Sequence, residues 1–382
     1  MHEKISEFLR ERVAANDFPS AVYLVAEKGE IVFHDAIGYA VVEPERIEAR
    51  PETIYDVASL TKVLVTGIMA AQSIDIGSVR PETNLGELLR EYESAPVGKL
   101  TIKQLATHTS GLPAWLPLYL FAETPEGVPG IFASQAPLEV DSKVEYSDLN
   151  FIALAAAVVR QSATANEFIE SEFYKRVIER IGIWNTAFNP FSSGHIFEIE
   201  GFAASEKGNK FERQTCIEQG YFRPPVQDGG LDDSPFRTYQ IWGEVHDGNA
   251  YFLGGAAGHA GLFSNAKDVY RIALQFLPNY TQLLKPETCE IFRTNFTKGM
   301  NEDRSFAFQL ASTEGSTAGA KMSRESFGHN GFTGTSLWID PVKERIFVLL
   351  TNRTHNHPLP FVNINSVRRR FHDMAVDLLD SR

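Results

Sequence analysis

The chain has 382 residues, of which 43% are hydrophobic and 22% are charged. This length and composition are typical of a globular protein with a large buried core. The formal net charge is −13 and the longest basic run is Arg368-Arg369-Arg370, so there is no broad basic face and nucleic acid is not expected as a partner. The longest apolar stretches have the length of strands, so no membrane span is predicted.

The first 18 residues are charged and helical in pattern, with neither the apolar core nor the cleavage site of a signal peptide. The chain as it stands is therefore expected to be cytoplasmic, or exported if a leader has been removed from it. Cys216 and Cys289 are too few for a disulfide framework and too far apart for a zinc motif. They are predicted to be unpaired thiols in a reducing compartment.

Two predicted β-hairpins frame the chain. The first covers residues 20–42, and its turn contains Gly29, which can supply a positive φ. The second covers residues 334–352, with its turn at Asp340-Pro341-Val342-Lys343. The segment after Ser366 has the apolar spacing of a helix.

The region between the hairpins is predicted to be helical or irregular. Residues 185–250 are rich in Gly, Pro, Asn and Asp and predict a long irregular segment, and loops of that length are usually functional or mobile. Apolar periodicity predicts helices at residues 57–74, 101–112, 147–161 and 264–277.

Strands at both ends and helices between them predict an α+β fold. We expect an antiparallel sheet built from both termini, flanked by helices and carrying a large, mainly helical insertion. The prediction is one domain over residues 1–382. Its α/β part covers about 1–60 and 265–382, and its helical subdomain about 61–264.

Ser59 and Lys62 are the first candidates for catalysis. They are three residues apart at the predicted start of a helix, so both lie on one helical face. The helix dipole and burial are expected to lower the pKa of Lys62, and a neutral lysine beside a serine is a general base. The alternative is a helix cap with a solvated lysine. A second Ser-x-x-Lys begins at Ser264, which is interpreted as the N-cap of a helix starting near Asp268.

Further motifs resemble those of the β-lactamase and penicillin-binding-protein superfamily. The resemblance is to its class C-like branch, which also holds family VIII carboxylesterases and D-aminopeptidases. The motifs occur in the expected order, and the resemblance covers nearly the whole chain. It implies a β-lactamase/transpeptidase-like serine hydrolase that needs no metal and no cofactor. The matching segments are residues 55–62 around the nucleophile, residues 105–112, Tyr146-Ser147-Asp148 for Tyr-x-Asn, and His329-Asn330-Gly331 for Lys/His-x-Gly.

The resemblance implies a role for each matching residue. Ser59 attacks a carbonyl carbon, Lys62 and Tyr146 handle its proton, and the backbone N–H groups of Ser59 and Phe332 form an oxyanion hole. Tyr146 can act as a base only if its pKa falls below its usual value of about 10, and a Lys62 cation is expected to lower it. The alternative for Tyr146 is a buried tyrosine packed before a helix.

Two residues depart from the family pattern. Asp148 replaces an amide, and it is predicted to contact substrate as an acceptor, to hold Lys62 by charge, or to cap a helix that begins at Leu149. His329 replaces the lysine of class C β-lactamases. A largely neutral histidine anchors a substrate carboxylate less strongly, which favours esterase or amidase chemistry. His329 is otherwise a hydrogen-bonded strand residue.

Residues 243–263 resemble a signature of a subgroup that includes N-acetylmuramoyl-L-alanine amidases. His246, Asn249 and His259, with Asp247, are candidates to line the substrate pocket together with Asn330 and Gly331. A structural loop whose polar groups satisfy one another is an equal alternative. A metal site formed by His246, Asp247 and His259 is not predicted, because the spacing matches no metal motif.

The predicted function is hydrolysis, through a Ser59 acyl-enzyme, of an amide or ester of a small molecule. The expected substrate is a cell-wall-derived muropeptide or a D-amino-acid-like compound. One alternative is a promiscuous carboxylesterase with weak β-lactamase activity, and another is a non-catalytic penicillin-binding-like sensor. Substrate choice is expected to depend on residues 113–140 and 185–250, and the sequence predicts no oligomeric state.

Overall fold

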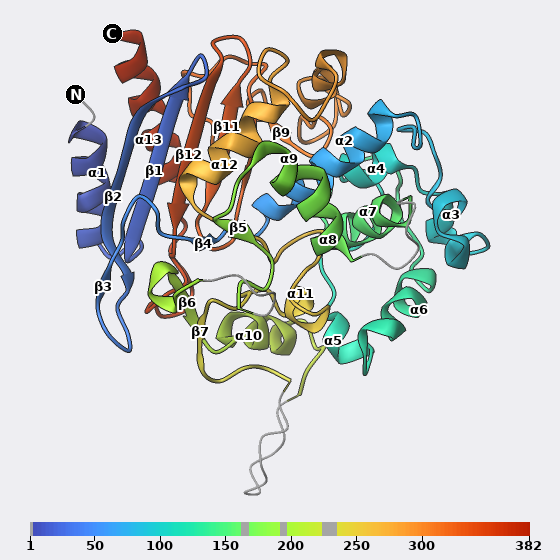
Figure 1. Cartoon of the computed structure of the whole chain (residues 1–382). Helices are drawn as coiled ribbons and strands as arrows, with labels where there is room; N and C mark the ends of the chain where they lie inside the picture. Colours follow the sequence, from blue (N-terminus) through green and yellow to red (C-terminus); the bar gives the residue numbers. More distant parts are fainter. Residues whose placement is uncertain (1–2, 162–167, 192–196, 224–234) are drawn as a thin grey trace, which may run out of the picture.

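The computed structural model describes residues 3–161, 168–191, 197–223 and 235–382 (Figure 1). Its main feature is a seven-stranded antiparallel sheet in the order β3-β2-β1-β12-β11-β10-β9. The predicted α+β fold, with strands from both ends of the chain in one sheet, is confirmed. The strands are β1 (Ser20–Glu27), β2 (Glu30–Val41), β3 (Ile47–Glu48), β9 (Gln309–Leu310), β10 (Phe327–Asn330), β11 (Ser336–Asp340) and β12 (Arg345–Thr351).

The first and last long strands are neighbours in this sheet. β1 pairs with β12 from Ala21 opposite Thr351 to Glu27 opposite Arg345. The turn between β1 and β2 has positive φ at its two central residues, 52° and 79° (the latter at Gly29), as a tight hairpin turn requires. Both predicted hairpins are therefore present.

Helices cover both faces of the sheet (Figure 1). Alternate residues of β1 point to opposite sides: Leu24 belongs to the core shared with the helical region, and Tyr23 to a second core under α1 and α13. Because β1 and β12 are buried on both faces, they are continuous apolar runs. The covering helices are α1 (Glu3–Ala14) and α13 (Asn365–Asp380) on one face and α12 (Ala266–Ala273) on the other.

A helical region follows β4 in the chain. The helix after Ser59 begins with a π-helical segment, Lys62–Gly67, and continues as α2 (Ile68–Asp75). α7 (Asp148–Arg160) packs against both of them. The other helices are α3 (Leu85–Leu88), α4 (Ile102–Ala106), α5 (Leu118–Phe121), α6 (Val128–Ala133), α8 (Ile169–Phe173), α9 (Glu179–Ile181), α10 (Lys210–Glu218) and α11 (Gly248–Phe252).

The predicted helix at residues 101–112 is shorter than expected. It ends after Ala106, because His108 takes a left-handed conformation with φ of 58°. The predicted irregular segment 185–250 also contains regular structure, namely β5 (Thr186–Ala187), β6 (Ala204–Lys207), α10, β7 (Gln240–Trp242) and α11. Residues 192–196 and 224–234 of that segment lie outside the described residues.

Ser264 does not cap a helix, so that prediction is wrong. It lies in β8 (Phe263–Ser264), which pairs with β4 (Tyr55–Asp56) and β5. Its hydroxyl lies 2.7 Å from Thr186 Oγ1. The next residue, Asn265, caps α12 by accepting the Asp268 N–H at 2.9 Å.

Two smaller predictions concern the membrane and the cysteines. In the described part of the chain, no helix is long and apolar enough to cross a membrane. Cys216 and Cys289 are both buried and unpaired, as expected.

Candidate active site

Ser59 lies in a strained turn between β4 and the helix that follows. Its neighbour Ala58 has φ of 49°, which a non-glycine residue rarely adopts. The carboxylate of Asp56 accepts the Ala58 N–H at 2.8 Å, and Thr61 Oγ1 donates to the Ala58 carbonyl at 2.7 Å. The turn therefore holds the half-buried Ser59 side chain at the edge of a cavity.

Lys62 contacts Ser59 from one helical turn further along. Its Nζ lies 3.0 Å from Ser59 Oγ, 2.7 Å from Asp148 Oδ1 and 3.1 Å from the His259 carbonyl oxygen. Burial acts to lower the pKa of Lys62, but the attraction of Asp148 and Tyr146 outweighs burial and raises the pKa. The predicted lowering is wrong, because the contact with the Asp148 carboxylate outweighs the effect of burial on the ammonium group.

Tyr146 completes this cluster. Its hydroxyl interacts with both Ser59 and Lys62, and its ring centre lies 4.9 Å from Lys62 Nζ. Burial raises the pKa of Tyr146 and outweighs the opposing effect of the lysine. The structure brings the three predicted residues together, but the expected lowering of the tyrosine pKa is wrong.

His108 supports this arrangement, and sequence reasoning missed it. Its ring lies 4.6 Å from that of Tyr146, and its Nδ1 accepts the Ser147 N–H at 3.0 Å and lies 3.1 Å from Asn150 Nδ2. Burial, with help from nearby cations, lowers the pKa of His108 well below 6.5, so the ring is neutral. The available signal was its place in residues 105–112, which match the family.

Asp148 is the first residue of α7, and Ser147 occupies the N-cap position. The prediction that Asp148 caps a helix beginning at Leu149 is therefore wrong. The predicted charge contact is present, since the carboxylate pairs with the fully buried Lys62. Asp148 also lines the cavity, so a contact to substrate stays a prediction.

β10 brings the His-Asn-Gly motif to the cavity, where His329, Asn330 and Gly331 all line the wall. His329 Nδ1 lies 2.9 Å from the Asn330 carbonyl oxygen, and its buried Nε2 has no hydrogen-bond partner among the described residues. Burial, together with the cations of Arg304 and Lys62, lowers the pKa of His329 well below 6.5. His329 is therefore neutral, as the sequence predicted.

The loop after β10 lies against the turn that holds Ser59. Thr333 and Thr335 donate their hydroxyls to backbone carbonyls of that turn at 2.8 and 2.9 Å. Within the described residues, neither the Ser59 nor the Phe332 N–H donates to a backbone carbonyl. The oxyanion hole formed by these two N–H groups stays a prediction.

The cavity has a volume of about 560 Å³, which is typical of small-molecule sites. Trp115, Phe211 and Phe332 give it an aromatic wall, and Phe211 and Phe332 contact each other with ring centres 4.7 Å apart. Glu212 and Asp247 add carboxylates to another part of the lining. Burial, followed by repulsion from Asp247, raises the pKa of Glu212 to about 7.

Arg304, Arg353 and Arg368 also line the cavity, and sequence reasoning missed all three. Arg304 is 4% exposed, and its Nη1 has no hydrogen-bond partner among the described residues. Its Nε forms an ion pair with Glu302 Oε1 at 2.8 Å, but the angle between them does not fit a hydrogen bond. Arg368 donates to the Gly331 carbonyl at 2.8 Å, and burial lowers its pKa to about 9. These residues are far apart in sequence and follow no motif.

Of the candidates His246, Asn249 and His259, only His246 lines the cavity. Its Nε2 lies 2.9 Å from Glu206, whose attraction outweighs burial and raises the pKa of His246. Asn249 and His259 are buried and are not among the residues that line the cavity. Asn249 instead hydrogen-bonds the backbone of the segment leading into α5.

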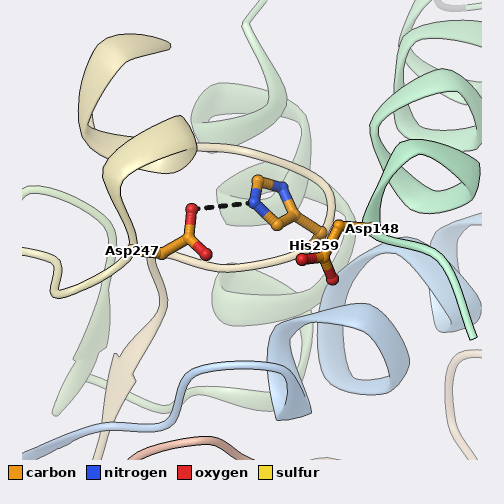
Figure 2. Close-up of side chains that lie close together, drawn as sticks. All are labelled: Asp148, Asp247 and His259. Carbon is orange, nitrogen blue, oxygen red and sulfur yellow. Dashed lines mark hydrogen bonds and ion pairs between the residues drawn. The ribbon is translucent and has the colours of Figure 1, made fainter. Parts of the chain in front are cut away.

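Asp148, Asp247 and His259 form a cluster whose ligand-type atoms lie within 4.8 Å of one another (Figure 2). His259 Nε2 contacts Asp247 Oδ1 at 2.9 Å. Lys62 contacts both Asp148 and the His259 backbone, so one of the two carboxylates of this cluster is already paired with a cation. His246 is not part of it, and we derive no metal chemistry from these residues.

Comparison with known proteins identifies the family. A family model described as Beta-lactamase matches residues 5–368. The chain belongs to the beta-lactamase family. It is a hydrolase of the serine type, and the predicted resemblance is confirmed.

Relatives within the family carry peptidase names. A protein of Escherichia coli K12 named "Putative D-alanyl-D-alanine carboxypeptidase" is 29% identical over 374 residues, which are 89% of this chain and 79% of the relative. A protein of the same name from Salmonella gallinarum is 29% identical over 373 residues, covering 89% of this chain and 80% of the relative.

Solved structures with low identity show the same fold. EstCE1, described as a hydrolase with promiscuous acyltransferase activity, matches with a TM-score of 0.71 at 19% identity, over 98% of this chain and 97% of that one. The octameric penicillin-binding protein homologue from Pyrococcus abyssi matches with a TM-score of 0.70 at 17% identity, over 98% of this chain and 77% of that one. A class C beta-lactamase matches with a TM-score of 0.70 at 13% identity, over 100% of this chain and 96% of that one.

Proposed function

We propose that the protein forms an acyl-enzyme at Ser59 and hydrolyses an amide next to a free carboxylate in a small peptide. The substrate would be a cell-wall fragment with D-amino-acid or muramoyl-alanine character. The observation that carries this proposal is the contact of Ser59 Oγ with Lys62 Nζ at 3.0 Å beside a cavity lined by three arginines, Arg304, Arg353 and Arg368. The names of the Escherichia and Salmonella relatives support the substrate class.

The proposed chemistry uses groups that lie around Ser59. The Lys62 and Tyr146 pair accepts the hydroxyl proton as Ser59 Oγ bonds to the carbonyl carbon, and later returns a proton to the leaving amine. The N–H groups of Ser59 and Phe332 hold the oxyanion, each donor contributing about 3 kcal/mol. Water then cleaves the acyl-enzyme.

The arginines supply a positive charge that His329 lacks. A neutral His329 donates or accepts a hydrogen bond but cannot neutralise a carboxylate. Arg304 and Arg368 are buried cations with unpartnered nitrogens among the described residues. Glu302 lies 2.8 Å from Arg304 Nε, but Arg304 Nη1 is free of hydrogen bonds and Arg368 forms no ion pair among the described residues. Since a buried cation without a counter-charge is unfavourable, a substrate carboxylate is the partner that fits Arg368, with Asn330, Gly331 and His246 as further contacts.

The nucleophile is tested by intact-mass analysis after incubation with a fluorophosphonate. We expect one adduct per wild-type chain and none on Ser59→Ala. A wild-type protein that takes up no adduct while remaining folded would favour the non-catalytic sensor and overturn the proposal.

The substrate class is tested by comparing N-acetyl-D-alanyl-D-alanine and N-acetylmuramoyl-L-alanine with a C-terminally amidated peptide and p-nitrophenyl acetate. Arg304→Met should lower kcat/KM about 10- to 100-fold on the free carboxylates, as expected for a lost charged hydrogen bond, and leave the acetate ester unchanged. The exposed Arg324→Met is the matched control. Turnover of the ester alone would assign the protein as a carboxylesterase.

A further inference from the structure

Asp148 and Lys62 form the closest charge pair in the site. The Lys62 side chain is fully buried, whereas that of Asp148 is 16% exposed and lines the cavity. Asp148 Oδ1 is 2.7 Å from Lys62 Nζ, closer than Ser59 Oγ at 3.0 Å. The lysine that contacts the serine is therefore held most tightly by a carboxylate.

The other polar groups around Lys62 come from three directions. The Ser59 turn offers a hydroxyl, Tyr146 a phenol from the segment before α7, and His259 a backbone carbonyl. None of these three is an anion in the resting site, because the tyrosine is a neutral phenol. Direct charge compensation therefore comes from Asp148.

More distant charges also act on this group. Asp247, at the N-terminus of α11, interacts electrostatically with Lys62 from the side of His259. Arg304 lies over the ring of Tyr146 at 5.5 Å, and its charge, like that of the lysine, acts on the neutral ring of His329. Among the charged groups of the described site, Asp148 is the one that contacts Lys62 directly, and its charge has the largest effect on the lysine.

We propose that Asp148 is a positioning residue that keeps Lys62 as an ammonium ion in the resting enzyme, so that the Lys62 and Tyr146 pair must release one proton to solvent before Ser59 can be acylated. This inference rests on the proposed function of Ser59. After that release, the vacant position on the pair receives the Ser59 proton as the Oγ–carbon bond forms. An asparagine at this position would leave Lys62 easier to deprotonate.

The consequence is a shifted pH dependence. An opposite charge within about 4–6 Å raises the pKa of a lysine by roughly one to three units. The reactive form is the deprotonated one, so the carboxylate moves the acid limb of the acylation rate to higher pH. Removing the carboxylate moves that limb to lower pH.

The test measures the second-order rate constant of fluorophosphonate labelling from pH 5 to 10. For Asp148→Asn, we expect the midpoint of the acid limb to fall by about one to three pH units relative to wild type. Asp148→Glu retains the charge and should return the midpoint toward the wild-type value. Asp377→Asn removes the carboxylate of an exposed aspartate–lysine pair outside the cavity, that of Asp377 with Lys321, and should leave the midpoint unchanged, since exposed charges are screened by salt.

An unchanged midpoint in a folded Asp148→Asn protein would overturn the inference, as would equal shifts in the Asn and Glu variants. If the Asn variant does not fold, Asp148→Ser carries the same test, because it removes the charge and leaves room for water. The two proposals fail differently. No labelling of the wild type at any pH defeats the proposed function, whereas normal labelling with an unmoved midpoint defeats only the role of Asp148.

Discussion

Gly331 shows how little space separates the two halves of the proposed oxyanion hole. A Cβ built on this residue would lie 2.0 Å from Thr335 Oγ1 and 2.6 Å from the Val57 carbonyl oxygen. The second atom belongs to the backbone of the Ser59 turn and cannot turn away. Any side chain at this position would push the loop after β10 from the nucleophile.

We therefore expect Gly331→Ala to slow fluorophosphonate labelling at least tenfold, because one misplaced oxyanion donor alone is worth 10²–10³ in rate. Gly130→Ala is the matched control: nothing lies within 4 Å of its Cβ, and it lies in α6. There alanine should raise stability by about 0.5–1 kcal/mol. Labelling at the wild-type rate in Gly331→Ala would contradict the proposed hole.

The residues of the site illustrate what a sequence can specify. The contact of Ser59 with Lys62 follows from a spacing of three at the start of a helix, where the Lys62 N–H also donates to the Ser59 carbonyl at 3.1 Å, so local periodicity predicts it. The direction of the lysine pKa does not follow from spacing, because it depends on Asp148, a residue brought in from another helix. The sequence likewise did not predict that arginines line the cavity, since their burial is a property of the tertiary structure.

At the scale of elements, the capping of α12 separates two adjacent candidates. The sequence favoured Ser264, but β8 extends through that residue and its hydroxyl faces Thr186. Asn265 is the residue with extended backbone, φ −97° and ψ 168°, whose side chain accepts an N–H of the first turn. Strand pairing decides which residue is free to cap the helix. The capping preferences of serine and asparagine alone therefore do not distinguish the two positions.

Replacement of Asn265 should measure this cap. Asn265→Ala is expected to lower the free energy of unfolding by about 1 kcal/mol, because one N–H of the helix loses its acceptor. Asn265→Gly should lower the free energy of unfolding by only a few tenths of a kcal/mol, because glycine is tolerated at the N-cap position. Urea unfolding distinguishes the two, and equal losses would show that the side chain acts by something other than capping.

At the scale of the whole molecule, the sheet was predictable because its two hairpins carry strong local signals. The places of the hairpins at the two ends of the chain also predicted that both contribute to one sheet, whereas the strand order is known from the structure. By contrast, α10, β6 and β7 within residues 185–250 were not predicted, because these elements are short and have little apolar periodicity. Their stability comes from contacts with distant segments, such as the bond from Gln240 to the Ser205 carbonyl.

Buried histidines should make the stability of the molecule depend on pH. Burial lowers the pKa of His372 from 6.5 to about 3, and its Nδ1 contacts the Thr317 carbonyl at 2.7 Å. The unfolded chain therefore binds this proton more tightly, so the stabilising contribution is complete above pH 6.5 and is lost as the pH falls toward 3. Its slope is about 1.4 kcal/mol per pH unit within that window.

The contribution is isolated by comparing wild type with His372→Asn, whose amide can still donate to the carbonyl. Urea unfolding at pH 7, 6 and 5 should give a stability difference that narrows as the pH falls. Titration of Glu212 changes the stability in the opposite direction, since its pKa is raised to about 7. Because both proteins contain Glu212, its effect cancels in the difference between them. A difference independent of pH would rule out titration of His372.

The pairing of β1 with β12 has a consequence for synthesis. Ala21 emerges from the ribosome long before Thr351, its partner in the sheet. At about 5–20 residues per second, the first hairpin waits roughly 15–60 s with an apolar edge that nothing covers. Such an edge is a template for pairing with other nascent chains. The period of greatest risk of aggregation is therefore the one before the last strand is translated, and chaperones that hold an unfinished sheet would matter most then.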